Sequence, residues 1–467
     1  MSGGLPAGVA AGHPATAAAG LEILSAGGSA ADAAVAASLA SCVAETVMTG
    51  LLGGGHAIFW DAAARRARNL DCFCAVPGIG AEPRPVELVE LEVPFGAELV
   101  HYAVGPGSCA VPGVAAGLGA LWREHGVLPW ARLVEPALRL ARDGVELPPA
   151  HAACLEMIAP VLTLDLGARI YAPAGRLLTA GERLEQPGLV AALEALSAEG
   201  PESVYAGTIG DALLQLGAER GATVTRADLA AYEASWSEPV EVERLGARWL
   251  TRGGISGVPE TLARLADLRG LSPAGRLLEL VAALDGTGEV AQHTTNLVAV
   301  DARGNACVLT TSLGLGSGDY LPGFDLHLNS MLGEAELLVD GVPAPGERIP
   351  SMMAPTLVLE DGELVLAAGS AGGSRLRTAL LTAALGVLDE QLPPREAVDR
   401  PRVHPAGAVV NAEPGCDEDG LAALEAAGRS VRRWPQRHHY FGGVSLVGRD
   451  GGAADPRRSG AALALGR

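Results

Sequence analysis

The amino-acid sequence predicts a single compact unit of mixed α/β class, and three observations support this prediction. Alanine-rich stretches at residues 14–24 and 30–40 have the composition of helices. Two apolar runs, at 292–301 and 306–309, flank a short Arg-Gly-Asn turn and are typical of paired strands. The 467 residues contain no Pro/Ser-rich linker, charge block or low-complexity tract that would divide the chain.

The composition indicates a large core built from small side chains. Hydrophobic residues make up 49% of the sequence, aromatic residues only 4%, and there are 62 glycines. Ala, Val and Leu are therefore expected to fill the interior, with close approaches between backbone segments. The net charge of −20 disfavours nucleic acid and anionic membrane surfaces as main partners, because both would be repelled. A small molecule is the expected partner.

The N-terminus and the cysteines bear on location and cofactors. Residues 1–6 lack a basic segment and an apolar run, so no secretory signal is predicted, and no apolar run is long enough for a membrane span. The seven cysteines are expected to be buried hydrophobes in a reducing, cytoplasmic compartment. A zinc enzyme is disfavoured because His and Cys show no ligand spacing, and no other cofactor is predicted.

Glycine-rich turns separate the elements expected near the N-terminus. Residues 51–60 are expected to form a glycine turn that runs into a strand, with residues 67–73 as its hairpin partner. His56 on the first strand is expected to be a packed side chain rather than a base. Cys72 and Cys74 are expected on one face of the second strand, because alternate residues of a strand point the same way.

Helix signals follow in the middle of the chain. A turn at 105–113 leads into a helix at 114–125, and the next helix is expected to carry Pro129 in its first turn. Thr225 and Asp228 have the spacing of a capping box, in which each side chain bonds the other residue's backbone N–H.

The elements expected in the second half of the chain are best described starting from the stretch around Thr294. Residues 285–288 are expected to form a flexible loop just upstream of Thr294. The hairpin at 292–309 then places the Thr294 hydroxyl at a strand entrance. A pair of Thr residues opening a strand also fits ordinary β-propensity, so the surrounding motifs must decide its meaning.

Those motifs resemble the catalytic half of the γ-glutamyltransferase family, N-terminal-nucleophile (Ntn) enzymes that cut their own chain before a Thr. In order, they lie at residues 292–301, 310–312, 314–318, 329–334, 350–356 and 369–375. Further matches, spread over nearly the whole chain, lie at residues 8–39, 51–57, 105–113 and 451–458. The resemblance implies a four-layer αββα sandwich, and a helical segment ahead of the cut that is reduced here to residues 259–284. It also implies a large-subunit segment, 1–293, and a small-subunit segment, 294–467, within one globule.

The chemistry implied for Thr294 depends on that cut. A Thr hydroxyl is a weak nucleophile at its free pKa and needs a base beside it. Breaking the bond between His293 and Thr294 would create an α-amino group whose ordinary pKa of about 7.7 to 8.0 suits a base near neutral pH. Thr294 would then attack a substrate amide to form an acyl-enzyme.

The resemblance assigns two further catalytic groups. Gly372 and Gly373 follow an expected strand at 364–368 and would present backbone N–H groups to a developing oxyanion. Ser312 stands where the family has a Thr that hydrogen-bonds the nucleophile, and it keeps the hydroxyl.

The substrate-binding positions depart from the family pattern. Phe73 stands where an Arg normally grips the substrate α-carboxylate, and a phenyl ring cannot replace that bidentate contact. Gly314, Met331 and Met352 stand for polar residues, whereas polar side chains remain at two positions, Glu334 and Ser351. Phe73, Met331 and Met352 fit core packing as well as they fit contact with substrate. If they face substrate, they favour a less polar acyl group.

Three functional hypotheses follow. The first is an Ntn amide hydrolase or acyltransferase with weak γ-glutamyl specificity, acting on a small-molecule amide with water or an amine as acceptor. The second is a conventional γ-glutamyltransferase or glutathione hydrolase. The third is an uncut, non-catalytic paralogue. The sequence favours the first hypothesis and leaves the oligomeric state open.

Overall fold

Two antiparallel sheets form the centre of the computed structural model, which describes residues 4–82, 86, 88–95, 98–285 and 294–466. In this part of the chain the larger sheet has seven strands in the order β22-β1-β11-β12-β2-β3-β8. Their bounds are β1 Gly8–Ala11, β2 Gly54–Asp61, β3 Arg66–Cys72, β8 Ser235–Ser237, β11 Thr295–Val300, β12 Ala306–Ser312 and β22 Ala461–Ala464.

The second sheet has six strands within the described residues, in the order β21-β20-β16-β15-β10-β9. Their bounds are β9 Val240–Arg244, β10 Ala247–Thr251, β15 Thr356–Glu360, β16 Glu363–Ala371, β20 Gly443–Gly448 and β21 Gly451–Ala454. The sheets pack face to face through apolar side chains, because Ile58, Val298 and Val308 of the larger sheet share one buried cluster with Leu357 and Ala367 of the smaller. Alternate residues of each strand therefore fill the middle of the molecule.

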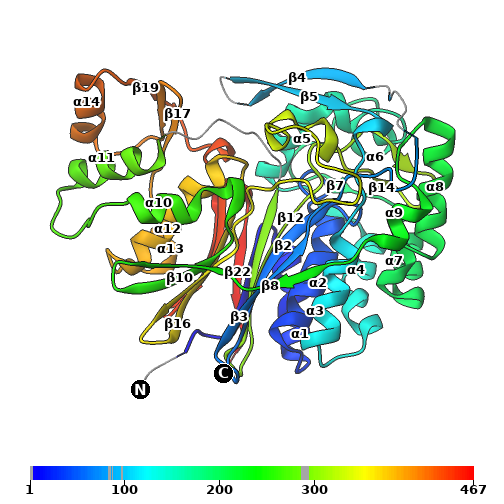
Figure 1. Cartoon of the computed structure of the whole chain (residues 1–467), viewed down its shortest axis with the longest axis horizontal. Coiled ribbons are helices and arrows are strands. Elements are labelled where there is room, and N and C mark those ends of the chain that lie inside the picture. The colour runs from blue at the N-terminus through cyan, green and yellow to red at the C-terminus, as the bar shows by residue number, and fades with distance from the viewer. Residues whose placement is uncertain (1–3, 83–85, 87, 96–97, 286–293, 467) are drawn as a thin grey trace.

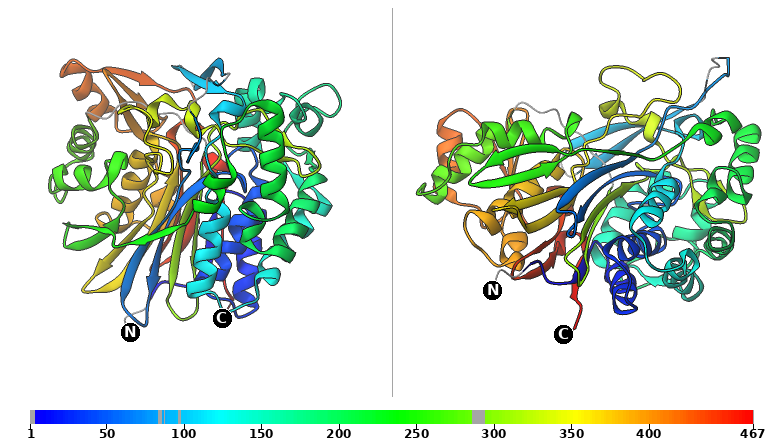
Figure 2. Two further views of the ribbon diagram at one scale, coloured as in Figure 1. Left: turned by 45° about the vertical axis from the view of Figure 1, so that its right-hand side comes forward. Right: turned by 60° about the horizontal axis from the view of Figure 1, so that its bottom comes forward.

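Helices cover the outer face of each sheet (Figure 1). Beside the larger sheet lie α1 Pro14–Ser25, α2 Ala30–Ala44, α3 Val114–His125, α4 Trp130–Asp143 and α7 Gly188–Glu199. Beside the smaller sheet lie α10 Val258–Arg264, α11 Pro273–Leu284, α12 Arg375–Leu388 and α13 Pro394–Asp399. The two rotated views show the same succession of helix, sheet, sheet and helix (Figure 2). The fold is the four-layer αββα sandwich expected from the resemblance.

The remaining elements lie around the sandwich. The helices are α5 Pro149–Leu162, α6 Gly167–Tyr171, α8 Thr208–Arg220, α9 Arg226–Ala231 and α14 Glu418–Ala426. The strands are β4 Val89–Phe95, β5 Glu98–Val104, β6 Val145–Glu146, β7 Arg183–Leu184, β13 Tyr320–Leu321, β14 Leu326–His327, β17 Val403–Ala406, β18 Val409–Ala412 and β19 Ser430–Arg433.

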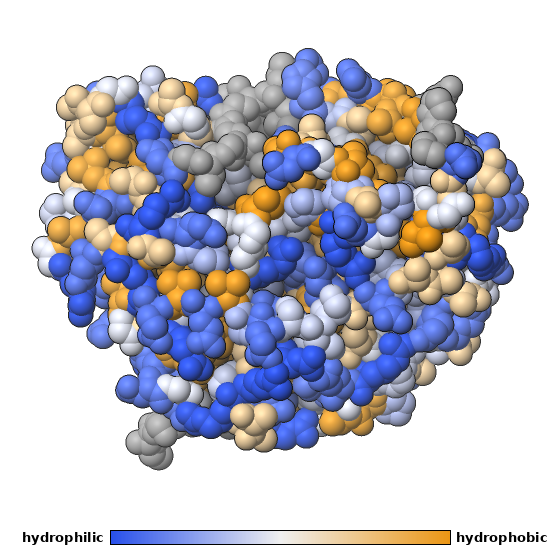
Figure 3. Space-filling model, in the orientation of Figure 1, coloured by the Kyte–Doolittle hydropathy of each residue, from blue (hydrophilic) through white to orange (hydrophobic). Residues whose placement is uncertain are grey.

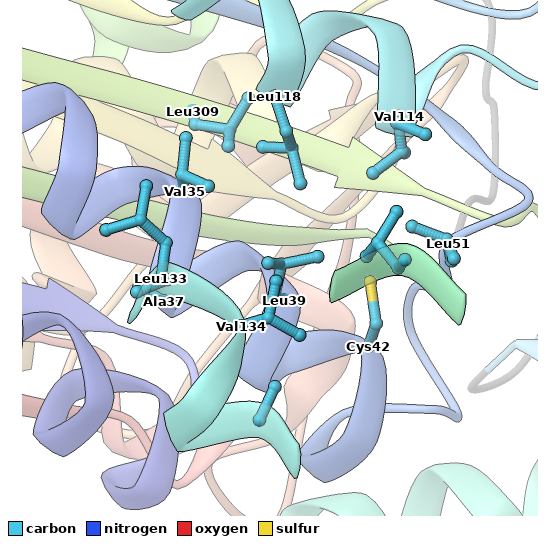
Figure 4. Close-up of a cluster of buried hydrophobic side chains, with 14 of the residues drawn as sticks. Val35, Ala37, Leu39, Cys42, Leu51, Val114, Leu118, Leu133, Val134 and Leu309 are labelled. Carbon is cyan, nitrogen blue, oxygen red and sulfur yellow. The ribbon is translucent and has the colours of Figure 1, made fainter. Parts of the chain in front are cut away.

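Helix α2 shows how the sequence sets the packing around the site. Its N-terminus is fixed by a capping box, because Ser29 accepts a hydrogen bond from the Asp32 amide while the Asp32 side chain accepts one from the Ser29 amide. Every residue of α2 is buried. Val35 and Leu39 pack near Leu309 of β12 in the core on this side of the sheet (Figure 4). The small side chains let the helix lie close to the sheet and bring its C-terminal end to the centre of the molecule.

Most local predictions are confirmed. The helix predicted at 114–125 is α3, with the same bounds, and the Thr225–Asp228 capping box is formed. The hairpin is formed by β11 and β12, which pair from Thr295 with Thr311 to Val300 with Ala306.

Three local predictions were wrong or incomplete. Pro129 is the N-cap of α4 rather than a residue of its first turn. Cys74 lies beyond β3, which ends at Cys72, because the chain leaves the sheet at Phe73. The helical stretch predicted at 259–284 is two helices, α10 and α11, and residues 286–288 of the predicted loop lie outside the described residues.

The surface shown in Figure 3 mixes polar and apolar residues. In the part of the chain that the structure describes, no helix is both long enough and apolar enough to cross a membrane. Six of the seven cysteines are buried, none of the seven is in a disulfide, and Cys416 is partly exposed.

Candidate active site

Thr294 lies directly before the central strand β11, which pairs with β1 on one side and β12 on the other. Its side chain is 2% exposed. Its Oγ1 has no hydrogen-bond partner among the described residues. A buried hydroxyl normally has a partner. This hydroxyl is therefore available to a substrate or a water.

Ser312 ends the neighbouring strand β12. Because Thr295 pairs with Thr311, continuing the register by one residue places Ser312 across from Thr294. The Ser312 Oγ accepts a hydrogen bond from the Gly314 amide at 3.0 Å. Ser312 is thus on the strand beside the expected nucleophile, and its role toward Thr294 stays a prediction.

Gly372 and Gly373 form the turn between β16 and α12. Their φ angles are +124° and +61°, a region that L side chains rarely adopt, so the turn requires glycine. A Cβ on Gly372 would lie 2.8 Å from the Gly442 Cα, so the backbones also approach closely here. The two amides precede the first turn of α12, where backbone N–H groups lack intrahelical acceptors and favour an anion.

A small cavity of about 10 Å³ joins the start of β11 to the second sheet. Thr294, directly before β11, lines it together with Thr295 and Asn296 of β11. Ala371 and Gly443 line it from the facing ends of β16 and β20. The predicted nucleophile therefore lies beside the strand end that leads into Gly372.

Glu45, the C-cap of α2, is a site residue that the sequence analysis missed. Its carboxylate accepts hydrogen bonds from the hydroxyls of Thr16 and Thr295. Burial raises the pKa of Glu45 from 4.5 to about 7, although those two hydrogen bonds and the charge of Arg458 act to lower it. One signal was available in the sequence: no other Asp, Glu, Lys or Arg lies between Asp32 and Asp61.

Arg458 is a second missed residue beside the cavity. Its side chain is buried, and Nη1 lies 3.1 Å from the Met48 sulfur. Nε and Nη2 have no hydrogen-bond partner among the described residues. A Cβ added at Gly372 would come within 3.3 Å of Nη2, so the guanidinium lies next to the glycine turn.

A buried ion-pair network supports this end of the site. Arg402 bonds Asp455, and Arg457 bonds both Asp455 and Glu413, all four side chains being at most 1% exposed. The Asp455 carboxylate also accepts a hydrogen bond from the Val444 amide of β20. The network thus fixes the turn that carries Arg458 against the strand that lines the cavity.

Phe73, Met331 and Met352 lie together in one buried apolar cluster. They are 0%, 0% and 6% exposed, and Phe73 stacks on His56 with a centroid distance of 5.5 Å. Burial lowers the pKa of His56 to about 3, so it is a packed neutral side chain, as predicted. The cluster establishes packing for the three residues and leaves their contact with substrate a prediction.

The two retained polar residues lie close to the altered positions. Gly314 has a φ of +68°, and a Cβ there would clash with the carboxylate of the buried Glu334. Ser351 is also buried, and its carbonyl accepts a hydrogen bond from Arg252 at 2.8 Å. Arg252 is a cation that the sequence analysis did not associate with the site. Within the described residues no group of three His, Cys, Asp or Glu side chains is arranged to hold a metal ion.

Comparisons with known proteins show the family and the fold of this chain. A family model described as gamma-glutamyltranspeptidase matches residues 16–269 and 278–465. The chain is 30% identical to the Acylase ACY 1 proenzyme of Pseudomonas sp. strain V22, over 93% of this chain and 88% of that protein. It is 27% identical to the glutathione hydrolase proenzyme of Escherichia coli K12, over 94% and 88%. The cephalosporin acylase structure from Bacillus halodurans shares the fold, with a TM-score of 0.81 and 22% identity over 99% and 96% of the two chains.

Proposed function

The chain belongs to the gamma-glutamyltranspeptidase family, and from that premise we propose that it cuts itself before Thr294 and then cleaves small-molecule amides through an acyl-enzyme. Segments 1–293 and 294–467 would remain one globule, because β1 pairs with both β11 and β22 across the cut. The observation that carries the proposal is the buried Thr294 hydroxyl, which lies directly before the central strand and has no hydrogen-bond partner among the described residues.

In the first reaction the Thr294 hydroxyl attacks the carbonyl carbon of His293. The peptide bond is exchanged for an ester, and water hydrolyses that ester to free the Thr294 α-amino group. The new amine has an ordinary pKa of about 7.7 to 8.0 and can act as the base in the second reaction. One hydroxyl thus serves both steps.

In the second reaction Thr294 attacks the substrate amide, and the carbonyl oxygen becomes an oxyanion. The amides of Gly372 and Gly373, ahead of the first turn of α12, would stabilise this charge. Ser312 would hold the nucleophile from the adjacent strand. Transfer of the acyl group to water or to an amine then restores the enzyme.

For the acyl group we propose weak preference for γ-glutamyl. By the resemblance, Phe73, Met331 and Met352 stand where the family has polar groups, and their apolar side chains share one buried cluster. A charged α-carboxylate would be costly to desolvate against this cluster. A less charged acyl group would avoid that cost.

A second candidate is conventional γ-glutamyl hydrolysis. By the same resemblance, Glu334 and Ser351 keep polar groups at two positions that would hold the amino acid. Arg252 adds a positive charge next to Ser351. The relative from Escherichia coli is named a glutathione hydrolase. This candidate predicts that glutathione is a good substrate.

A panel of p-nitroanilides separates the two candidates. The proposal predicts that kcat/KM for an uncharged acyl group, such as butyryl, exceeds that for γ-glutamyl, and that Thr294→Ala releases no nitroaniline from either. If kcat/KM is higher for γ-glutamyl-p-nitroanilide, and for glutathione measured beside the panel, than for the uncharged acyl group, the conventional activity would be established instead. A wild-type chain that is folded, stays whole and acts on none of these amides would support a non-catalytic role.

A further inference from the structure

The uncut chain lacks the base that the cut enzyme uses. Before the cut, the nitrogen of Thr294 is part of a peptide bond and cannot accept a proton, yet the Thr294 hydroxyl must lose one to attack. The inference drawn here rests on the proposed self-cleavage and concerns the group that takes this proton.

Two carboxylates, Glu45 and Asp455, line the cavity beside Thr294, and Glu45 is the one that meets this need. It lines the same cavity as Thr294, and it accepts a hydrogen bond from Thr295, the next residue along β11. Thr16 fixes its other oxygen at 2.6 Å. A Cβ added to Gly12 would lie 2.5 Å from Glu45 Oε2, so the carboxylate is packed directly against backbone. Its position is therefore held from three sides.

The cavity has about the size of one water molecule, and polar groups lie among the residues that line it. Its volume is about 10 Å³, near the lower limit for a single water. Thr294 Oγ1 and Asn296 Nδ2 belong to lining residues and have no hydrogen-bond partner among the described residues. A buried water commonly bonds two to four such groups, so a water here could join Thr294 to Glu45.

Among the described titratable groups near Glu45, none of the others is placed to exchange a proton near pH 7. Burial lowers the pKa of His151 to about 3 and that of His13 to about 4, so both imidazoles are neutral near pH 7. Burial raises the pKa of Cys42, on the same helix, to about 12. Asp455 is held by Arg402 and Arg457.

Arg458 is the remaining charge at the cavity. Its positive charge favours the ionised form of Glu45. No ion pair within 4 Å joins it to a carboxylate among the described residues. The ionised carboxylate is therefore stabilised from a distance while both of its oxygens stay bonded to hydroxyls.

We propose that Glu45 is the proton-relay residue of self-cleavage: through one water in the cavity, its carboxylate accepts the proton of Thr294 Oγ1 and returns it to the nitrogen of Thr294. The bond from the His293 carbonyl carbon to that nitrogen breaks, and the bond from the same carbon to Oγ1 forms. The proton ends on the departing amine, so the step is balanced. Water then hydrolyses the ester, which gives the His293 carboxylate and restores the Thr294 hydroxyl.

The test follows newly made chains. Chains from cell-free translation are pulse-labelled, translation is stopped, and the fraction cut is measured over time between pH 5 and pH 9. In the wild type the rate of cutting should rise with pH through about 7 and then level off, because the ionised carboxylate is the active form. Glu45→Gln should cut at least about 10²-fold more slowly without this rise.

Three further variants separate proton relay from support of the fold. Glu45→Asp keeps a carboxylate and should retain pH-dependent cutting. Thr16→Val removes a hydrogen bond that lowers the pKa of Glu45, so the midpoint of the pH profile should move to higher pH. Asp32→Asn changes another fully buried carboxylate of α2, at the opposite end of the helix, and should cut with the wild-type profile.

The outcomes distinguish this inference from the proposed function. If the wild type stays whole, the proposed function fails and the inference fails with it. If the wild type is cut and folded Glu45→Gln is cut at the same rate, the inference alone is overturned. Cut Glu45→Gln, collected after long incubation, should turn over amide within about tenfold of the wild type, because the α-amine is then the base. A loss of about 10²-fold or more in that cut fraction would contradict the relay.

Discussion

Replacing Glu45 by Gln should change how stability depends on pH, in a direction fixed by its burial. The pKa of this carboxyl is raised from 4.5 to about 7 in the folded chain. Between these two values the folded chain binds more protons than the unfolded chain, so the free energy of unfolding falls as pH rises. The loss is complete above about pH 7. The amide side chain of the variant has no proton to release in this range, so the variant should show no such loss.

The size of the effect follows from the same two values. Each pH unit corresponds to about 1.4 kcal/mol, so the step from 4.5 to about 7 costs the folded wild-type chain on the order of 3 kcal/mol. Relative to its parent, Glu45→Gln should therefore become more stable by on the order of 3 kcal/mol between pH 4.5 and pH 8. All other titratable groups are the same in the variant and its parent, so their contributions cancel when the two free energies of unfolding are subtracted.

The assay is guanidinium unfolding at pH 4.5 and pH 8, followed by tryptophan fluorescence. Both proteins carry Thr294→Ala, so that the chain stays whole and the two unfolded states are alike. A difference between variant and parent that is the same at both pH values, within about 0.5 kcal/mol, would refute the assignment of a raised pKa to Glu45. It would also remove the physical basis for a relay near neutral pH.

Three further predictions concern the glycine turn, the acyl pocket and the ion-pair network. Gly373→Val should lower amide turnover by about 10²-fold or more in folded protein, because the side chain crowds the oxyanion. The matched variant is Gly373→Ala, which strains the backbone at the φ of +61° less. Unchanged kcat in both variants would contradict a role of Gly373 in stabilising the oxyanion. Phe73→Arg should recover part of the activity on γ-glutamyl-p-nitroanilide, because a charge-assisted hydrogen bond to a carboxylate is worth about 1.5 to 3 kcal/mol. Unchanged kcat/KM for this substrate would show that residue 73 does not face the acyl group. Asp455→Asn should destabilise the fold by about 3 to 5 kcal/mol, because it leaves Arg402 buried without its carboxylate partner. Glu363→Gln, which breaks an exposed ion pair, should cost less than about 1 kcal/mol. Equal shifts in Tm for the two variants would contradict this contrast.

Local sequence chemistry predicted the elements well where neighbouring residues determine them. The capping box at Thr225 and the bounds of α3 depend on residues a few positions apart, and both are confirmed. The prediction failed at Cys74, because alternation along a strand holds only while the chain remains in the sheet. The strand ends at Cys72, and the backbone then turns toward the apolar cluster around Phe73.

The candidate site was only partly visible in the sequence. The spacing of motifs placed Thr294 and the glycine turn, because each motif keeps its own local geometry. Glu45 lies in no matched motif, and the match at 451–458 assigned no role to Arg458. Both residues reach Thr294 only through the folding of α2 and of the turn at 456–458. The hydrogen bond between Glu45 and Thr295 joins residues 250 positions apart. A lone carboxylate in an otherwise uncharged stretch was the one local sign of Glu45.

The central claim is that Thr294 becomes an N-terminal nucleophile, and the intact mass of the purified chain tests it most directly. The wild type should give two fragments that meet between His293 and Thr294, whereas Thr294→Ala should give one full-length chain. N-terminal sequencing of the smaller fragment should begin at Thr294. A wild-type chain that stays whole after incubation at neutral pH, or a cut at another position, would contradict the account.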